Sequence, residues 1–265
     1  MDRFTILCLG DVVGRPGRRV LRERLPGLRK KFAVAMVMAN GENAAGGLGL
    51  TPETARELLA AGVDVITSGN HIWKHKSMHP LLGKQENILR PANYGNEVPG
   101  SGFCLHRLDC GTQVGVINLI GRSFMNPVNC PFHAADTALE ALKEQGADLC
   151  LVDFHAEVTS EKIALGYHAD GRVSALWGTH THVQTADERI LQKGTGYITD
   201  LGMTGARDGV LGLRHAPIVY QFRTGVHEPF CQETMGSMQI CGCIFSIDEE
   251  TGHTTAIRRL TIIEN

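Results

Sequence analysis

The sequence has no hydrophobic run approaching the ~20 residues that cross a bilayer. Its first residues lead into an apolar segment that is too short for a secretory signal. It also lacks an excess of charge of one sign, since 26 Lys and Arg residues face 28 Asp and Glu residues, for a net charge of −2. Without a basic field, we expect no binding of nucleic acid in a groove. These absences predict a cytoplasmic protein with no membrane partner.

Several other common features are missing. Residues 10–14 lack the Gly-x-Gly-x-x-Gly spacing of a dinucleotide-binding turn. The eight cysteines are scattered, mostly within apolar runs, and are predicted to be reduced and buried in a cytosolic chain. Cys241 and Cys243 lie in an alternating, strand-like segment whose spacing matches no common zinc site. No repeat, low-complexity stretch or linker divides the sequence, so residues 1–265 are expected to form a single domain.

Apolar segments of strand length alternate with amphipathic helical segments along the chain. Thr51 as N-cap, Pro52 at the first helical position and Gly62 just past the end delimit one helix, and residues 14–17 are predicted to form a turn before another. The predicted strands are 4–9, 34–39, 63–67, 114–120, 149–154, 173–177, 196–200, 218–223, 238–247 and 254–263, and the predicted helices are 18–31, 52–61, 134–146 and 160–167. This order indicates an α/β fold with a largely parallel sheet, and two strand-rich halves suit a sandwich with helices outside.

Side chains that can bind metals stand at five predicted strand ends. They are Asp11, Glu42 with Asn43, Asn70 with His71, His155, and His180 with His182. In open α/β sheets, ligands gather at the carboxyl ends of the strands, so we expect these side chains to converge. Along an extended 178–182 segment, alternation would send both imidazoles to the same side. Taken singly, each has a structural alternative: a helix cap at Asp11, turns at the asparagines, and a core position for His155.

The mixture of donors indicates what the site would do. Three of these histidines, the two carboxylates and one or two asparagines together exceed the needs of one transition metal. They suit two ions bridged by a carboxylate and a hydroxide, which lie ~3.5–4 Å apart in two-metal hydrolases and assist phosphoryl transfer. The sequence therefore predicts a dinuclear metal site.

The order of these motifs resembles that of the calcineurin-like metallophosphoesterases, and the chain is similar over essentially its whole length to the YmdB-like branch. The matching segments are Gly-Glu-Asn-Ala-Ala-Gly-Gly at 41–47, Gly-Asn-His-x-Trp at 69–73, Asp-Phe-His-Ala-Glu at 153–157, Gly-Thr-His-Thr-His at 178–182 and Thr-Asp-x-Gly-Met-Thr-Gly at 199–205. The chain departs from the wider superfamily because Asp11 is followed by Val12 and Val13, without the usual histidine, and Glu42 replaces the usual bridging aspartate. Both departures are features of the YmdB-like branch.

The resemblance implies a four-layer α/β/β/α sandwich with mixed sheets. It also implies two metal ions, iron or manganese: one held by Asp11, Glu42, Asn43 and His182, the other by Asn70, His155 and His180, with Glu42 as the bridge. His71 would be the general acid, which is reasonable because an imidazole titrates near neutral pH. The alternative for His71 is a residue that orients a metal ligand.

The resemblance further implies a phosphodiesterase that hydrolyses cyclic nucleotides, 2′,3′-cyclic monophosphates above all. A metal-bridged hydroxide would attack phosphorus while His71 protonates the departing ribose oxygen. Two alternatives stay open: a phosphomonoesterase with the same metal site, and a regulatory protein with weak catalysis that binds an RNA-turnover partner. We expect a homo-oligomer, as in the family. Arg15, Arg122 and Arg207 are candidate phosphate contacts or surface charges, and segment 199–205 is either a pocket wall or a structural turn.

Overall fold

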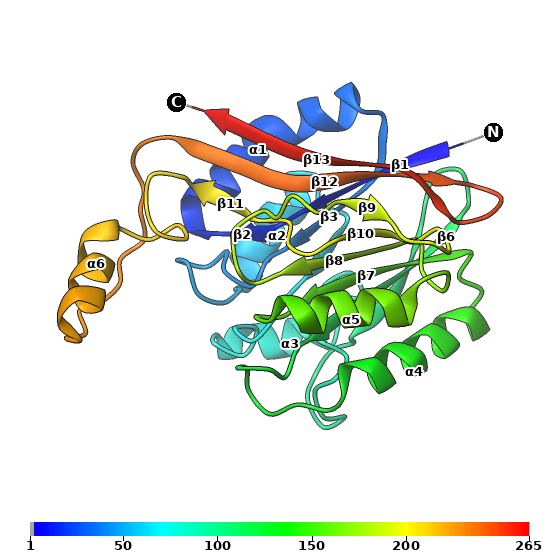
Figure 1. Ribbon diagram of the computed structural model, residues 1–265, viewed down its shortest axis with the longest axis horizontal. Helices are drawn as coiled ribbons and strands as arrows, with labels where there is room; N and C mark the ends of the chain where they lie inside the picture. Colours follow the sequence, from blue (N-terminus) through cyan, green and yellow to red (C-terminus); the bar gives the residue numbers. More distant parts are fainter. Residues whose placement is uncertain (1–2, 265) are drawn as a thin grey trace.

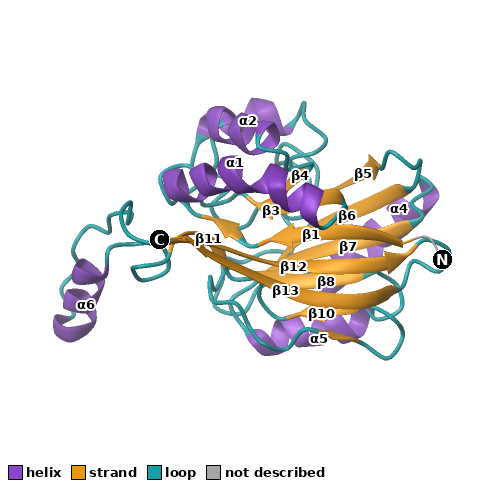
Figure 2. Ribbon diagram, turned by 90° about the horizontal axis from the view of Figure 1, so that it is seen from above, coloured by secondary structure: helices purple, strands orange, loops and turns teal. Residues whose placement is uncertain are grey.

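Two β-sheets packed face to face, with helices on both outer faces, make up the computed structural model, which describes residues 3–264 (Figures 1 and 2). The strands are β1 (Arg3–Leu9), β2 (Asp11–Val12), β3 (Val34–Asn40), β4 (Val65–Thr67), β5 (Phe103–Arg107), β6 (Gln113–Ile120), β7 (Leu149–His155), β8 (Ala175–Thr179), β9 (Arg189–Ile190), β10 (Gly196–Ile198), β11 (Met203–Ala206), β12 (Met238–Asp248) and β13 (Thr254–Glu264). The helices are α1 (Gly14–Lys31), α2 (Pro52–Ala60), the 3₁₀ turn η1 (Lys76–Met78), α3 (His79–Leu82), α4 (Pro131–Glu144), α5 (Thr159–Ala169) and α6 (His215–Thr224).

Both sheets are mixed. The seven-stranded sheet has the order β2-β11-β12-β1-β3-β4, with β13 paired to β12; β1, β3 and β4 run parallel, while β12 is antiparallel to β1. The six-stranded sheet has the order β5-β6-β7-β8-β10-β9, with parallel central strands and antiparallel edges at β5 and β9. The predicted α/β class and four-layer sandwich are confirmed.

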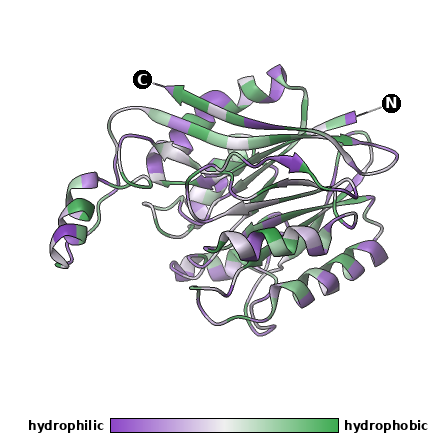
Figure 3. Ribbon diagram, viewed as in Figure 1, coloured by the Kyte–Doolittle hydropathy of each residue, from purple (hydrophilic) through white to green (hydrophobic). Residues whose placement is uncertain are grey.

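Three apolar cores separate the four layers. Alternation along β1 sends Leu7 toward α1 and α2 but Ile6 toward the second sheet, as the two-residue period of a strand requires. The core between the sheets includes Trp177 and Phe245, whose ring centroids lie 5.8 Å apart. The third core joins the six-stranded sheet to α4 and α5, which show both hydrophobic and hydrophilic residues (Figure 3). Residues 1, 2 and 265, which the single-domain prediction includes, lie outside the described range.

Two local predictions are wrong. The segment 218–223, predicted as a strand from its β-branched and aromatic residues, belongs to helix α6. This helix projects away from the sheets (Figure 1), where no strand edge can satisfy its backbone, and a helix satisfies its own. Residues 14–17, predicted as a turn, form the first turn of α1, where a side chain at Gly17 would meet the Thr204 carbonyl at 2.3 Å.

The longest helix, α1, is amphipathic and ends in basic residues. In the described part of the chain, no helix is both long enough and apolar enough to cross a membrane. All eight cysteines are free, and Cys241 and Cys243 are buried in β12, as predicted, whereas Cys110 and Cys231 are exposed. The only group of His, Cys, Asp and Glu side chains placed to hold an ion between residues 3 and 264 lies elsewhere and contains no cysteine.

Candidate metal centre

All eight predicted site residues lie together where strands of both sheets end. Asp11 lies in β2, just after β1, and His155 is the last residue of β7. The other six lie in the loops after β3, β4 and β8, and they are Glu42, Asn43, Asn70, His71, His180 and His182. The convergence predicted from the strand ends is therefore present, and it draws on two sheets instead of one.

The tightest cluster contains Glu42, His155 and His180, which each offer one donor atom within 4.8 Å of the others. His155 Nε2 lies 3.3 Å from Glu42 Oε1 and 3.0 Å from His180 Nδ1. The side-chain oxygen of Asn70 lies 3.1 Å from the same His155 nitrogen. These four side chains present a carboxylate, an amide oxygen and two imidazoles to one point, a donor set that suits a transition-metal ion.

A second cluster adjoins the first. His182 Nε2 lies 3.7 Å from Asp11 Oδ1 and 3.1 Å from Asn43 Nδ2. Asn43 also donates from Nδ2 to Glu42 Oε1 at 3.2 Å, while its oxygen lies 2.8 Å from His71 Nδ1. In this orientation the side-chain oxygen of Asn43 faces His71. Rotation of the amide by half a turn would place that oxygen beside His182. Glu42 thus lies between the two clusters.

Three observations fit bound cations. Asp11 Oδ1 is buried and has no hydrogen-bond partner within residues 3–264, although a buried carboxylate needs a compensating charge. His155 Nε2 and His180 Nδ1 face each other at 3.0 Å, so at most one can carry a proton between them and the other presents a lone pair. A Cβ at Gly69 would lie 2.2 Å from His155 Cδ2 and 2.4 Å from Glu42 Oε2, so only glycine leaves this space free.

The electrostatics hold the carboxylates in their metal-binding form. Burial alone would raise the pKa of Glu42, but the charges of His155 and His71 hold it well below its usual range. Burial opposes the charge on His155, yet Glu42 and Asp11 raise the pKa of this imidazole to about 9. Burial and the neighbouring His155 lower the pKa of His180 to about 4. A cation between these groups would replace the proton that the carboxylates now hold on His155.

Outer contacts orient the histidine rings. His180 Nε2 lies 3.0 Å from Glu157 Oε2, and His182 Nδ1 lies 3.2 Å from the Leu211 carbonyl. His155 Nδ1 lies 3.0 Å from Thr179 Oγ1. Such partners fix which nitrogen is free to bind a metal. No role was predicted for Glu157, although it ends one of the matching segments, and nothing in the sequence points to Leu211, whose contribution is a backbone atom.

The prediction that strand alternation sends His180 and His182 to the same side is wrong. Strand β8 ends at Thr179, and both histidines have a left-handed backbone, with φ values of 101° and 63°. Non-glycine residues seldom adopt this conformation, and it persists where surrounding contacts impose it. Both imidazoles still reach the centre, but a folded loop directs them there instead of strand alternation.

The contacts that impose this loop come from segment 199–205. Asp200 Oδ2 accepts hydrogen bonds from Thr181 N at 3.2 Å and Thr181 Oγ1 at 2.7 Å, and Asp200 Oδ1 accepts one from Gly202 N at 2.8 Å. The Asp200 carboxylate also forms an ion pair with Lys162, with 2.7 Å between Oδ2 and Nζ, and both side chains are fully buried. Of the two alternatives for this segment, the structural turn therefore has direct support. Met203 in addition lines a cavity with His182.

His71 differs from the other imidazoles in its exposure. Its Nδ1 lies 3.0 Å from Glu42 Oε1, and its backbone N–H donates to Glu42 Oε2 at 3.0 Å. A quarter of its side chain is exposed, whereas the side chains of His155 and Glu42 are buried. Of the three candidate arginines, all of them exposed, Arg207 lines the cavity that contains His182, so it is the one placed beside a residue of the centre.

Comparison with known proteins assigns the chain to a family. A family model described as YmdB-like protein matches residues 7–260. The chain is 45% identical over 258 residues to a protein of Bacillus subtilis (strain 168) named 2′,3′-cyclic-nucleotide 2′-phosphodiesterase, and the match covers 97% of this chain and 96% of the relative.

Two solved structures share the fold over the full chain. A protein from Thermus thermophilus, described as hypothetical, is 40% identical, with a TM-score of 0.91, and the match covers 99% of this chain and 100% of that one. A Mycoplasma pneumoniae protein described as a novel phosphatase is 33% identical, with a TM-score of 0.92, and the match covers 100% of this chain and 95% of that one.

Proposed function

Since this chain belongs to the YmdB-like family and is a metallophosphoesterase, we propose that it is a dinuclear phosphodiesterase that hydrolyses 2′,3′-cyclic nucleotides. One observation carries the proposal: two adjoining clusters of metal-binding side chains share Glu42, whose Oε1 lies 3.3 Å from His155 Nε2 and 3.2 Å from Asn43 Nδ2. The substrate class is proposed from the name of the Bacillus subtilis relative.

We propose that each cluster holds one ion. Asp11, Asn43 and His182 would bind the first, Asn70, His155 and His180 the second, and Glu42 both. Carboxylate, amide and imidazole donors suit iron or manganese. Such ions would supply Lewis acidity toward the phosphoryl oxygens and a water of lowered pKa.

The chain's own contribution to the reaction is a proton at the leaving oxygen. His71 is held by Glu42 and by the side chain of Asn43, yet remains a quarter exposed. An imidazole fixed in this way can donate to the ribose oxygen that departs when the cyclic ester opens. The alternative role, orienting Glu42 or Asn43, would use the same contacts.

A comparison of substrates tests the proposed reaction. We expect the metal-loaded enzyme to hydrolyse 2′,3′-cyclic AMP faster than 3′-AMP, because the site would serve a phosphodiester, whereas 3′-AMP is a phosphomonoester. Product formation followed by chromatography gives both rates. A faster reaction with 3′-AMP would favour the phosphomonoesterase alternative. This alternative is retained because the Mycoplasma pneumoniae structure is described as a phosphatase.

The variant His71→Gln sharpens this test. Loss of a general acid should lower the rate on 2′,3′-cyclic AMP on the order of 10²–10⁴-fold. The loss should be far smaller on bis(p-nitrophenyl) phosphate, whose leaving group needs little protonation. His75→Gln is the matched control, since His75 contacts the Leu48 carbonyl outside the centre. Equal losses on both substrates would assign His71 an orienting role.

The predicted homo-oligomer is supported by helix α6. This helix projects from the body (Figures 1 and 2) and exposes 86% of Phe222 and 46% of Val219. Exposed apolar side chains of this kind mark association surfaces. We propose that a second copy of the chain packs against α6. Light scattering should show an oligomer that Phe222→Ser dissociates; a monomeric wild-type chain would disprove it. The RNA-turnover partner and the cytoplasmic location stay predictions.

A further inference from the structure

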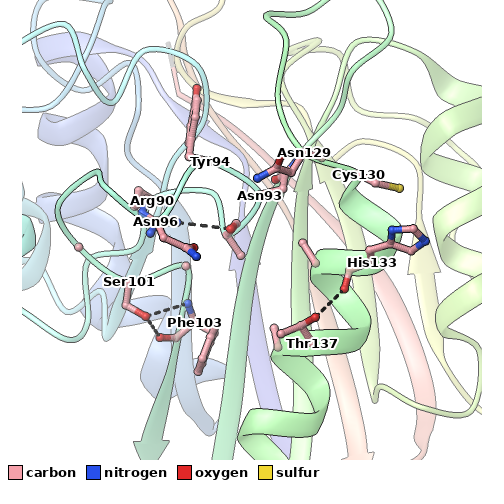
Figure 4. A pocket seen from close by; sticks show the side chains of 15 residues that line it. Arg90, Asn93, Tyr94, Asn96, Ser101, Phe103, Asn129, Cys130, His133 and Thr137 are labelled. Atoms are coloured by element: carbon pink, nitrogen blue, oxygen red, sulfur yellow. Dashed lines mark hydrogen bonds between the residues drawn. The ribbon is translucent and has the colours of Figure 1, made fainter.

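A cavity of about 570 Å³ lies outside the metal centre, between the 90–103 segment and the beginning of α4. Figure 4 shows Arg90, Asn96 and Ser101 on one side of it and Asn129, Cys130 and His133 on the other. None of the eight residues of the centre lines it, and its volume is in the range of small-molecule sites.

Arg90 is the unusual residue in this cavity. Its side chain is only 7% exposed, and no carboxylate within residues 3–264 forms an ion pair with it. Nη1 donates to the Pro91 carbonyl at 2.8 Å and to the Ala92 carbonyl at 3.4 Å, whereas Nε is buried without a partner and Nη2 makes no hydrogen bond in the described part of the chain. A buried charge is costly unless it is paired. Burial accordingly lowers the pKa of Arg90, with no acidic group to oppose the effect.

The opposite wall provides a second source of positive potential. Helix α4 begins at Pro131 with no side chain capping it and no acidic residue in its first turn. Cys130, His133 and Ala134, at this end of the helix, line the cavity. The N-terminus of a helix carries free N–H groups and a partial positive charge, which attract anions. No acidic residue lines the cavity, so Arg90 and the N-terminus of α4 both make the electrostatic potential inside it more positive.

We propose that this cavity binds a small phosphorylated molecule, with its phosphate between the Arg90 guanidinium and the first turn of α4. A guanidinium presents a fork of donors that matches phosphate geometry, and the free N–H groups of a helix start complement it. The remaining volume accommodates the body of the ligand beside the side chains of Asn96, Asn129 and Thr137. This site is independent of the metals and does not rest on the proposed phosphodiesterase function.

Calorimetric titration of the full chain with AMP tests the proposal, with and without a chelator that removes metal ions. We expect an AMP site that persists in chelator. Arg90→Met should weaken it about 10- to 100-fold, the loss for a charged hydrogen-bonding partner. Arg90→Lys should weaken it less, because the charge remains. Arg19→Met, at an exposed arginine of α1, is the matched control and should bind as wild type does.

A second variant protects the test against misfolding. His133→Glu places an acidic residue in the first turn of α4, where it favours the helix. Its negative charge should nevertheless weaken AMP binding. The proposal is overturned if wild type binds no AMP in chelator, or if Arg90→Met binds it equally well. Adenosine and succinate identify the chemistry: equal binding of adenosine would remove the role of the phosphate, and tighter Arg90-dependent binding of succinate would make this a carboxylate site.

Discussion

The variant Glu42→Gln is expected to lose bound metal and to lower hydrolysis of 2′,3′-cyclic AMP at least on the order of 10²–10³-fold, the effect of removing one electrostatic group from an active site. The substitution keeps the shape of the side chain but removes its charge. Glu42 is 1% exposed, and it contacts both His155 and His71. A neutral amide cannot serve as an anionic bridge between two ions, so occupancy of both clusters should fall. Elemental analysis and initial rates on the same preparations measure the two effects.

Glu157→Gln is the comparison variant for this experiment, and it should lower metal binding and activity less than Glu42→Gln does. Glu157 Oε2 lies 3.0 Å from Nε2 of His180, the far nitrogen of that ring, and half of the Glu157 side chain is exposed. Loss of a partner that orients a ligand should reduce metal affinity or activity by about 10- to 100-fold at most. A Glu42→Gln protein that retained two metals per chain and full activity would show that the centre works without this bridge. The ligand assignment would then have to be redrawn around Asp11.

The variant Lys162→Met should cause the largest loss of stability. Lys162 and Asp200 are fully buried and paired at 2.7 Å, and removing one partner leaves the other as an uncompensated buried charge. Such a change costs about 3–5 kcal/mol, or a fall in Tm of roughly 6–20 °C for a chain of about this size. Activity should fall as well, because Asp200 also holds Thr181 between the two histidines. Thermal unfolding followed by circular dichroism measures the shift.

Two further variants separate charge from packing at this pair. Lys143→Met, on the exposed surface of α4, should change stability by no more than about 0.5 kcal/mol. The double variant Lys162→Met with Asp200→Asn should recover much of the Tm, since it removes both buried charges together. If Lys162→Met unfolds at the wild-type temperature, the pair makes no net contribution. The loop would then be held by its backbone contacts alone.

The core strands show what could be predicted locally. The apolar runs at 34–39 and 149–154 are buried strands, because a segment hydrophobic on both faces is stable only between two layers. The helix after Thr51 begins where its capping residue and Pro52 predict. Local pattern failed at 218–223, because β-propensity states how a segment would pack in a sheet and says nothing of whether a sheet edge is available.

The family, most of the core strands along the chain and the side chains that follow their ends could be predicted without coordinates, because apolar runs and motifs are local features of the sequence. The order of the strands within each sheet was not predicted. The backbone conformation that brings His180 and His182 to the centre could not be predicted from the sequence. Their left-handed backbone is held by Asp200, which bonds Thr181 and is paired with Lys162. The folded chain also shows that Asp11 Oδ1 is a buried carboxylate oxygen without a hydrogen-bond donor among residues 3–264, and that Arg90 is buried without a carboxylate in the same range. Such properties depend on which distant segments pack together, and no pattern within one segment records them.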